Sequence, residues 1–343
     1  MSDIAPFLKN AWYMAAWAHE VDDGLLPRRL LDMPVLLFRK ADGSICTLLD
    51  RCPHRFAPLS MGSRVGDTVR CAYHGLAFDG AGQCVHNPFS AKIPASTSVR
   101  SFPTHVRDGI VWFWPGDPAT ADEGRIPDFS AIFAGGHAPI TGLMPLAANY
   151  EFGTDNLMDL SHIEFVHKGS FAGRGVIFAG EHQVVASGET LQSNWWMPGV
   201  PAPSHTFGIY DREMITDHWL DMHWTPPANM LLEIGASPAG AARQTGVIVH
   251  QAHILTPETA ETTHYFWATS RTGAPSEQGD AMLASLLEKA FRDEDKPIIE
   301  AAYANLDGGD FWAAKPVSLG IDGGGTRARR MIEKLKKQEE TAQ

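Results

Sequence analysis

Two cysteines and two histidines near the N-terminus have the types and spacing of a mixed-ligand iron site. Cys52-Pro53-His54 is followed, after sixteen residues, by Cys71-Ala72-Tyr73-His74. Thiolates can bind one iron of a [2Fe–2S] cluster while imidazoles bind the other, which raises the reduction potential to roughly −150 to +300 mV. Each pair can occupy one tight turn, with the two turns facing each other. We predict that Cys52, His54, Cys71 and His74 hold such a cluster.

A structural zinc site is the alternative for this motif, because two cysteines and two histidines also suit tetrahedral zinc. Zinc sites usually pair cysteine with cysteine and histidine with histidine, a pattern that C-x-H with C-x2-H fits poorly. The other two cysteines, Cys46 and Cys84, lie outside the motif. We expect them to be buried apolar residues rather than ligands.

A second set of metal-ligating residue types runs from Asp155-Asn156 through Asp159 to His162 and His167. Two histidines and one carboxylate can bind one face of Fe(II) and leave open positions for O₂ and substrate. Asp159 and His162 share a helix face, but His162 and His167 lie about 140° apart around a regular α-helix. We therefore predict a π-type bulge or a helix break between the two histidines.

His218 and His223 repeat the spacing of His162 and His167. Their segment looks like a strand, which would point the two side chains to opposite faces. It also lacks the neighbouring acidic and amide residues, so context favours the earlier pair. The carboxylate ligand must come from elsewhere, and the acidic triplet 293–295 offers three candidates that the residues alone do not separate.

The elements that would carry these residues divide the chain at about residue 118. Short apolar runs at Val35–Phe38 and Ile110–Trp114 alternate with turn signals, which indicates an all-β part over residues 1–118. The breaker Pro115–Pro118 follows. Residues 119–343 mix strands and helices, so the predicted class is α+β.

The second part has the following expected elements. A helical pattern carries Asn156–His167, and strand-like stretches lie around 190–197, 229–235, 246–255 and 262–270. Gln278–Ala304 is expected to form a long helix, and Arg327–Glu340 a charged amphipathic one. Gly323–Gly325 lacks the spacing of a nucleotide-binding loop, so we expect a turn before the last helix.

Composition excludes several classes of protein. The net charge of −12 over 343 residues argues against a nucleic-acid partner. The chain has neither a secretory signal pattern nor a run of about 20 apolar residues that could span a membrane. Four cysteines are too few for a disulfide scaffold. These features predict a cytoplasmic protein with no membrane association.

Several stretches resemble the Rieske non-heme iron oxygenases. Cys52–Ser60, Cys71–Leu76 and Asp155–His167 are similar to the signatures of that family. Further similarity, running from Asn10–Tyr13 to Gly324–Leu335, points to its vanillate and dicamba O-demethylase branch. The resemblance implies a Rieske [2Fe–2S] β-domain joined to a catalytic domain with an antiparallel sheet and helices. It also implies that Asp295 is the third ligand of the mononuclear iron.

The resemblance carries implications for assembly. The family forms head-to-tail homotrimers, in which the cluster of one subunit serves the iron of its neighbour. Asp159 would then accept a hydrogen bond from His74 of the partner subunit, and Asn156 and Asp159 become the candidate catalytic residues. The alternative for Asp159 is an acceptor for His162 within the same chain.

The chemistry implied by the resemblance is a monooxygenase reaction. NADH reduces a separate reductase of the flavin and ferredoxin type, which passes single electrons to the cluster and on to the Fe(II). With O₂ as co-substrate, a methyl group is hydroxylated, and an aryl methyl ether then yields a phenol and formaldehyde. Hydroxylation or N-demethylation of another small aromatic is an alternative. A Rieske electron carrier is another, although the second ligand set argues against it.

Three residues bear on the aromatic substrate. His253 matches a family position that can touch a substrate oxygen, and a buried core histidine is the alternative role. Leu232 and Leu286 stand where the dicamba enzyme carries Asn and Trp. This difference argues against a dicamba-like substrate. The stretch Pro226–Glu233 is more similar to the vanillate enzymes, so the resemblance favours a vanillate-like methoxylated aromatic acid.

Overall fold

The computed structural model describes residues 6–168, 170, 175–203, 206, 209–271 and 275–341. The chain forms two compact units. The described residues up to Ile126, with Thr256–Ala260, make the N-terminal unit. Residues 127–255 and 261–340 make the C-terminal unit.

The N-terminal unit consists of three small sheets, in the orders β1-β11-β10, β2-β3-β4-β9 and β5-β6-β7-β8. Its strands are β1 (Tyr13–Trp17), β2 (Leu26–Leu30), β3 (Met33–Arg39), β4 (Ile45–Leu49), β5 (Ser63–Val65), β6 (Thr68–Arg70), β7 (Ala77–Phe78), β8 (Cys84–His86), β9 (Ser101–Phe102), β10 (Thr104–Arg107) and β11 (Ile110–Phe113). Short 3₁₀ turns are η1 (Ala18–Glu20), η2 (Leu59–Met61), η3 (Pro118–Thr120) and η4 (Glu123–Arg125). The two apolar runs noted in the sequence are strands β3 and β11, as predicted.

A hydrophobic core anchors the turns that carry the four motif residues. Cys52 and Cys71 are both 2 % exposed and belong to one cluster of buried side chains. Leu36 and Phe38 of β3 belong to the same cluster, as does Phe78 of β7. The motif is therefore held between two sheets of this unit.

The N-terminal unit continues to Ile126, whereas the sequence placed the boundary at residue 118. The indole Nε1 of Trp12 donates a hydrogen bond to the carbonyl oxygen of Asp122 at 2.8 Å. This bond fastens the segment after the proline-rich breaker to the first sheet.

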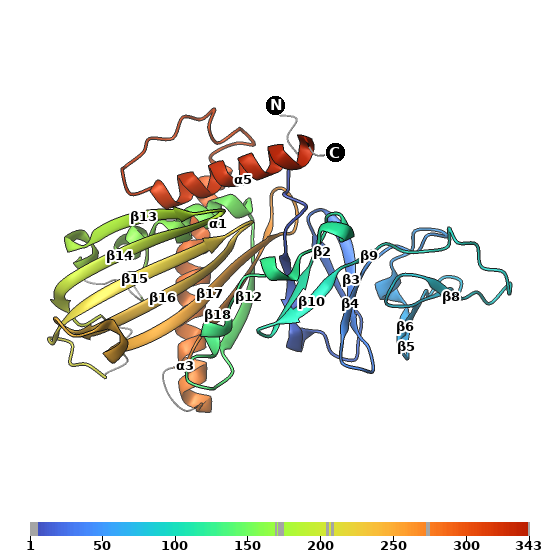
Figure 1. Cartoon of the computed structure of the whole chain (residues 1–343), viewed down its shortest axis with the longest axis horizontal. Helices are drawn as coiled ribbons and strands as arrows, with labels where there is room; N and C mark the ends of the chain where they lie inside the picture. Colours follow the sequence, from blue (N-terminus) through green and yellow to red (C-terminus); the bar gives the residue numbers. More distant parts are fainter. Residues whose placement is uncertain are drawn as a thin grey trace. The chain divides into compact units, whose positions relative to one another are not determined.

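A seven-stranded sheet dominates the C-terminal unit, in the order β12-β18-β17-β16-β15-β14-β13 (Figure 1). Its strands are β12 (Ile140–Leu146), β13 (Glu181–Ser187), β14 (Thr190–Pro201), β15 (Ile215–Thr225), β16 (Asn229–Pro238), β17 (Val247–Pro257) and β18 (Thr263–Thr269). The strands from β13 to β17 pair antiparallel in succession, and β12 pairs antiparallel with β18. All four strand-like stretches predicted in this part are confirmed.

Helices cover one face and one edge of this sheet (Figure 1). They are α1 (Tyr150–Met158), α2 (Ile163–Val166), α3 (Glu277–Glu288), α4 (Lys296–Ala304) and α5 (Gly323–Thr341), with 3₁₀ turns η5 (Ser130–Phe133), η6 (Leu160–His162), η7 (Val176–Ala179) and η9 (Arg243–Thr245). A π-helix, η10 (Lys289–Asp295), joins α3 to α4. The expected long helix is therefore continuous but locally widened. The predicted α+β class is confirmed.

The glycine run is the start of the last helix, so the expected turn there was wrong. Helix α5 begins at Gly323. A Cβ atom on Gly324 would lie 2.7 Å from the carbonyl oxygen of Met158, and one on Gly325 would lie 2.8 Å from Asp155 Oδ1. The glycines allow α5 to approach α1, a tertiary demand that local sequence does not reveal.

None of the described helices is both long and apolar enough to cross a lipid bilayer.

Candidate metal centres

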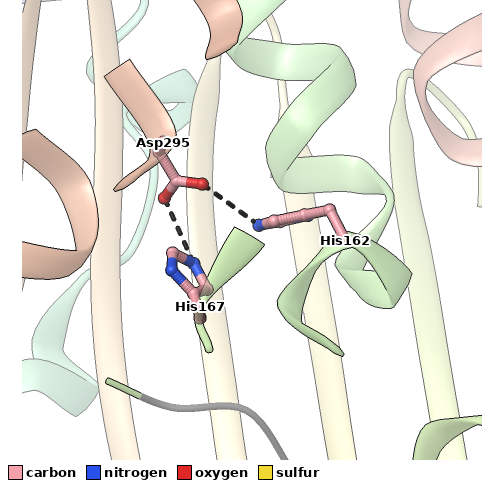
Figure 2. Close-up of side chains that lie close together, drawn as sticks. All are labelled: His162, His167 and Asp295. Atoms are coloured by element: carbon pink, nitrogen blue, oxygen red, sulfur yellow. Dashed lines mark ion pairs between the residues drawn. The ribbon is translucent and has the colours of Figure 1, made fainter. Parts of the chain in front are cut away.

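Three side chains of metal-ligating types, His162, His167 and Asp295, point toward one another in the C-terminal unit (Figure 2). Nε2 of His162 lies 3.4 Å from Oδ1 of Asp295, and Nε2 of His167 lies 3.3 Å from Oδ2. One ligand atom from each residue lies within 4.8 Å of the other two. His167 is 4 % exposed and Asp295 2 %. The structure thus brings together the two histidines named from the sequence and Asp295, the carboxylate that the family resemblance implied.

The two histidines are positioned by a change of helix type rather than by a bulge. Helix α1 ends at Met158, and Asp159 leaves helical geometry at φ −122° and ψ 89°. The chain then forms the 3₁₀ turn η6, which ends at His162, and the single α-turn α2, after which His167 caps the end. The π-type bulge or helix break predicted between the histidines is not there, because the break lies before His162, at Asp159. A tight 3₁₀ turn leading into a short helix brings both rings to one side.

The Nδ1 atoms of the two histidines fix which nitrogen faces the centre. Nδ1 of His162 lies 2.6 Å from the carbonyl oxygen of Asp159, and Nδ1 of His167 lies 2.9 Å from Oε2 of Glu294. Because both partners are acceptors, each Nδ1 must carry a proton and donate it. In the neutral rings both Nε2 lone pairs then point at carboxylate oxygens. A cation between them resolves this repulsion, so the donor set fits a metal ion.

The electrostatics of the group favour an ionised carboxylate. Burial alone would raise the pKa of Asp295, but the hydrogen bonds and charges of His162 and His167 outweigh it and hold that pKa well below its usual range. Burial would lower the pKa of His167, and the neighbouring carboxylates of Asp295 and Glu294 raise it instead. A buried anion facing two imidazoles is the charge arrangement that a divalent cation requires.

Glu294 is a site residue that the sequence offered only as an alternative ligand. Glu294 accepts hydrogen bonds from Nδ1 of His167 and from the Ser170 hydroxyl. The side chains of the acidic triplet therefore point in three different directions. Asp293 is exposed, Glu294 contacts His167, and Asp295 faces the candidate metal centre. The π-helix η10 sets the directions of these three side chains, and the sequence pattern did not predict a π-helix at this position.

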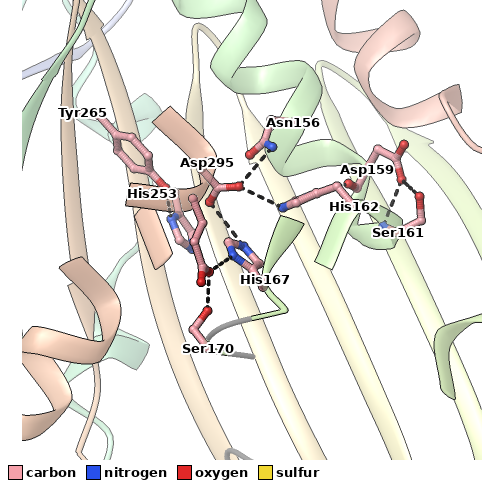
Figure 3. A network of polar contacts seen from close by, with 10 residues as sticks. Asn156, Asp159, Ser161, His162, His167, Ser170, His253, Tyr265 and Asp295 are labelled. Atoms are coloured by element: carbon pink, nitrogen blue, oxygen red, sulfur yellow. Dashed lines mark hydrogen bonds and ion pairs between the residues drawn. The ribbon is translucent and has the colours of Figure 1, made fainter. Parts of the chain in front are cut away.

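The residues proposed as catalytic lie beside the three convergent side chains. Nδ2 of Asn156, on α1, lies 3.4 Å from Oδ1 of Asp295, at the long limit of a hydrogen bond. Oδ1 of Asp159 accepts from the backbone N–H and the hydroxyl of Ser161 (Figure 3). Asp159 thus meets His162 through its backbone carbonyl, whereas its carboxylate is half-buried and bound to Ser161.

A buried ion pair holds α1 against α5. The guanidinium of Arg329 is bound to the Asp155 carboxylate, with Nη2 and Oδ2 2.6 Å apart, and also to Glu151 at 2.8 Å. Its side chain is 5 % exposed. Burial raises the pKa of Asp155, and the charge of Arg329 opposes that rise. Because α1 carries Asn156 and leads into the histidine turns, this contact fixes the segment from which the centre is built.

The four motif residues of the N-terminal unit form a second candidate centre. The carbonyl of Cys52 accepts from Phe56 N–H at 2.9 Å, and that of Cys71 accepts from Gly75 N–H at 3.0 Å. Phe56 and Gly75 both have positive φ, at 61° and 73°. The two cysteines therefore begin two turns of the same kind, as the sequence suggested.

The donor atoms of these turns converge. The imidazole rings of His54 and His74 lie 4.5 Å apart between centroids. Nδ1 of His74 is buried and has no hydrogen-bond partner among the described residues, which fits a nitrogen that binds iron. Burial raises the pKa of the Cys52 thiol, while the His54 backbone N–H stabilises its thiolate. Two thiols beside two imidazoles fit a Rieske-type cluster.

Comparisons with known proteins decide the family. Residues 11–103 match the Rieske [2Fe-2S] domain, and residues 146–338 match the vanillate O-demethylase oxygenase C-terminal domain. The oxygenase component of dicamba O-demethylase from Stenotrophomonas maltophilia is 40 % identical over 97 % of this chain and 99 % of its own length.

The chain belongs to the Rieske oxygenases of the vanillate and dicamba O-demethylase family.

Two further relatives of this Rieske oxygenase are informative. The oxygenase component of chloroacetanilide N-alkylformylase from Rhizorhabdus wittichii is 36 % identical, over 95 % of both chains. A crystal structure of dicamba monooxygenase with non-heme iron and dicamba superposes with a TM-score of 0.86, at 37 % identity over 99 % of this chain and all of the other. The predicted family and its cofactors, a [2Fe–2S] cluster and a mononuclear iron, are confirmed.

The mononuclear centre of this Rieske oxygenase opens into a mostly apolar cavity. Besides the three convergent residues and Glu164, its polar lining consists of His218, Gln251, His253 and Thr269. Leu232 lines it, as the resemblance suggested, and Leu283 of α3 does so in place of Leu286. His218 is 5 % exposed and His223 is exposed, so the second histidine pair does point to opposite faces.

Proposed function

We propose that this chain is the terminal oxygenase of a multicomponent monooxygenase that removes the methyl group of a small methoxylated aromatic acid. The observation that carries the proposal is the pairing, in one chain, of a Rieske motif with a two-histidine, one-carboxylate centre at the base of an apolar cavity. The names of the relatives, dicamba and vanillate O-demethylases, support an aryl methyl ether as substrate. The resemblance of Pro226–Glu233 to the vanillate enzymes favours a vanillate-like compound.

The residues of the chain have separate roles in this reaction. We assign Cys52, His54, Cys71 and His74 to the cluster, and His162, His167 and Asp295 to the mononuclear iron. That iron, reduced through the cluster by a separate reductase, supplies O₂ activation. The apolar wall keeps water from the reacting methyl group. His253 lines the cavity, and its buried Nε2 has no hydrogen-bond partner in the described part of the chain, so we assign it to hold a substrate oxygen.

We propose a head-to-tail homotrimer in which Asp159 accepts a hydrogen bond from the partner subunit's His74. Each of the two units carries exposed aromatic side chains close to its candidate metal centre. Tyr73 and Phe89 are 63 % and 77 % exposed beside His74, and Phe165 and Phe178 are 63 % and 65 % exposed next to the histidine turns. Two different apolar patches on one chain suit a heterologous, ring-closing interface. Asp159→Asn should slow turnover while leaving both metals bound.

Two finer features complete the proposal. The reductase is of the flavin and ferredoxin type and takes its electrons from NADH. The protein acts in the cytoplasm, a reducing compartment that suits four cysteines without a disulfide.

The direct test is a panel of methoxylated aromatic acids with NADH and a surrogate reductase. Formaldehyde release coupled to O₂ uptake, for vanillate and related methoxybenzoates, is the expected result. Oxygen uptake with a hydroxylated ring and no formaldehyde would instead show a ring hydroxylase.

N-dealkylation is a second candidate, favoured by one relative. The chloroacetanilide N-alkylformylase component matches this chain over 95 % of its length. Adding N-alkylated anilides to the panel separates the two reactions. Turnover of anilides alone would reject the ether as the natural substrate.

A further inference from the structure

A buried histidine–tyrosine pair, His253 and Tyr265, lies close to the candidate iron ligands, and the roles assigned so far include His253 but leave Tyr265 unexplained. Nδ1 of His253, on β17, lies 2.6 Å from the Tyr265 hydroxyl, on β18 (Figure 3). His253 is 2 % exposed and Tyr265 1 %. The other ring nitrogen, Nε2, has no hydrogen-bond partner among the described residues. His253 lines the cavity.

The protons of this pair can be placed by counting unsatisfied groups. If Nδ1 donated to the tyrosine oxygen, the phenolic proton would have no acceptor, because the described residues offer the Tyr265 hydroxyl no second partner. The Nε2 lone pair would also have no donor, so two buried groups, the phenolic O–H and Nε2, would lack a hydrogen bond. If the hydroxyl instead donates to Nδ1, the Nε2–H is the single group of the pair that lacks a hydrogen-bond partner among the described residues. Each orphaned buried group is costly, so the second arrangement is favoured.

The surroundings keep both groups neutral and hold their rings in place. Burial lowers the pKa of His253 to about 4, and burial raises the pKa of Tyr265 well above its usual value. Phe291, on η10, packs against both: its ring centroid lies 5.3 Å from that of His253 and 5.9 Å from that of Tyr265. A ring flip that would exchange the two nitrogens is therefore hindered.

We propose that Tyr265 is a positioning residue that fixes the tautomer of His253, so that Nε2–H points into the cavity as a donor. This rests on the proposed function and deepens it. The site selects an aromatic substrate that presents an oxygen acceptor, such as an ether or carboxylate oxygen, at this point. A substrate group that can only donate is disfavoured there, because two N–H or O–H groups cannot pair.

The test compares Tyr265→Phe with Tyr13→Phe in the holoenzyme. Tyr13 is a matched control, because it is 1 % exposed and its hydroxyl donates to the Leu8 carbonyl at 2.6 Å, in the N-terminal unit. Infrared difference spectra against His253→Gln report which nitrogen of the neutral imidazole carries the proton. The expected result is an Nε2–H tautomer in wild type and in Tyr13→Phe, and a mixture in Tyr265→Phe. An Nδ1–H tautomer in wild type, or an unchanged band in Tyr265→Phe, would overturn the assignment.

A binding measurement tests the selectivity. The probes are 3,4-dimethoxybenzoate, whose 4-oxygen only accepts, and vanillate, whose 4-hydroxyl also donates. In Tyr265→Phe the dissociation constant of 3,4-dimethoxybenzoate relative to that of vanillate should rise about twofold, because only the Nε2–H fraction of the mixed tautomers binds the ether oxygen whereas vanillate can pair with both tautomers. An unchanged ratio would refute the selectivity. If neither acid binds, the proposed substrate class fails, and the infrared result alone decides the role of Tyr265.

Discussion

Glu294 holds His167 by its outer ring nitrogen, with Nδ1 and Oε2 2.9 Å apart, while the next residue in the chain faces the same ring from the other side. One short stretch of η10 thus supplies both the candidate ligand, Asp295, and the group that orients a second ligand. A carboxylate bound to the distal nitrogen of a metal-ligating histidine fixes its tautomer and raises its basicity.

The first prediction concerns this carboxylate. Glu294→Gln should weaken retention of the mononuclear iron by about tenfold or more, because the neutral amide no longer enforces the Nδ1–H tautomer. Iron competition with a chelator measures the effect, with the cluster spectrum as an internal reference. Asp293→Asn is the matched control, since Asp293 is acidic, adjacent and exposed. Equal iron loss in both variants would show a general charge effect instead.

The second prediction separates ligand cysteines from bystanders. Cys71→Ala should abolish most of the visible absorption of the cluster, because a thiolate ligand is lost. Cys84→Ala should leave that absorption intact, since Cys84 is half-buried and lies outside the two turns. Colourless wild-type protein containing zinc would contradict the cluster assignment altogether.

The third prediction is a pH dependence of stability. Burial lowers the pKa of His218 to about 4, although its bond to the Gly235 carbonyl opposes the shift. In the unfolded chain the value is about 6.5. The unfolded state therefore binds the extra proton first, and the free energy of unfolding falls by about 1.4 kcal/mol per pH unit as the pH drops from 6.5 towards 4.

Denaturant unfolding at several pH values measures this slope. His218→Gln should reduce the slope by about 1.4 kcal/mol per pH unit in that window, whatever its effect on absolute stability, and the contribution of His253, whose pKa is also lowered to about 4, should remain. His223→Gln should keep the wild-type slope, because His223 is exposed. A wild-type slope in His218→Gln would mean that His218 is protonated equally in both states.

Local features of the centres could be predicted from the sequence, and features set by distant contacts could not. The cluster motif is readable because its four residues lie on two short turns, each closed by its own backbone hydrogen bond. The helical segment carrying His162 was recognisable, but the bulge or break expected between His162 and His167 was wrong in position, because the helix breaks earlier, at Asp159. The directions of the 293–295 side chains depend on a π-helix packed over the sheet.

The glycines at the start of α5 illustrate the same limit. Gly324 and Gly325 pack on Met158 and Asp155, residues far away in sequence, so their pattern carries no local signal. The partner of His253 was equally hidden. Tyr265 lies on the next strand, and only strand pairing brings its hydroxyl to the imidazole.

The measurement that bears most directly on the two-centre account is metal analysis of His162→Ala beside wild type, with turnover recorded on the same samples. Wild type should contain about three irons per chain, two in the cluster and one at the mononuclear centre. His162→Ala should contain about two, keep the visible spectrum of the cluster, and consume no O₂ with substrate. A variant that retains the third iron and full turnover would contradict the account.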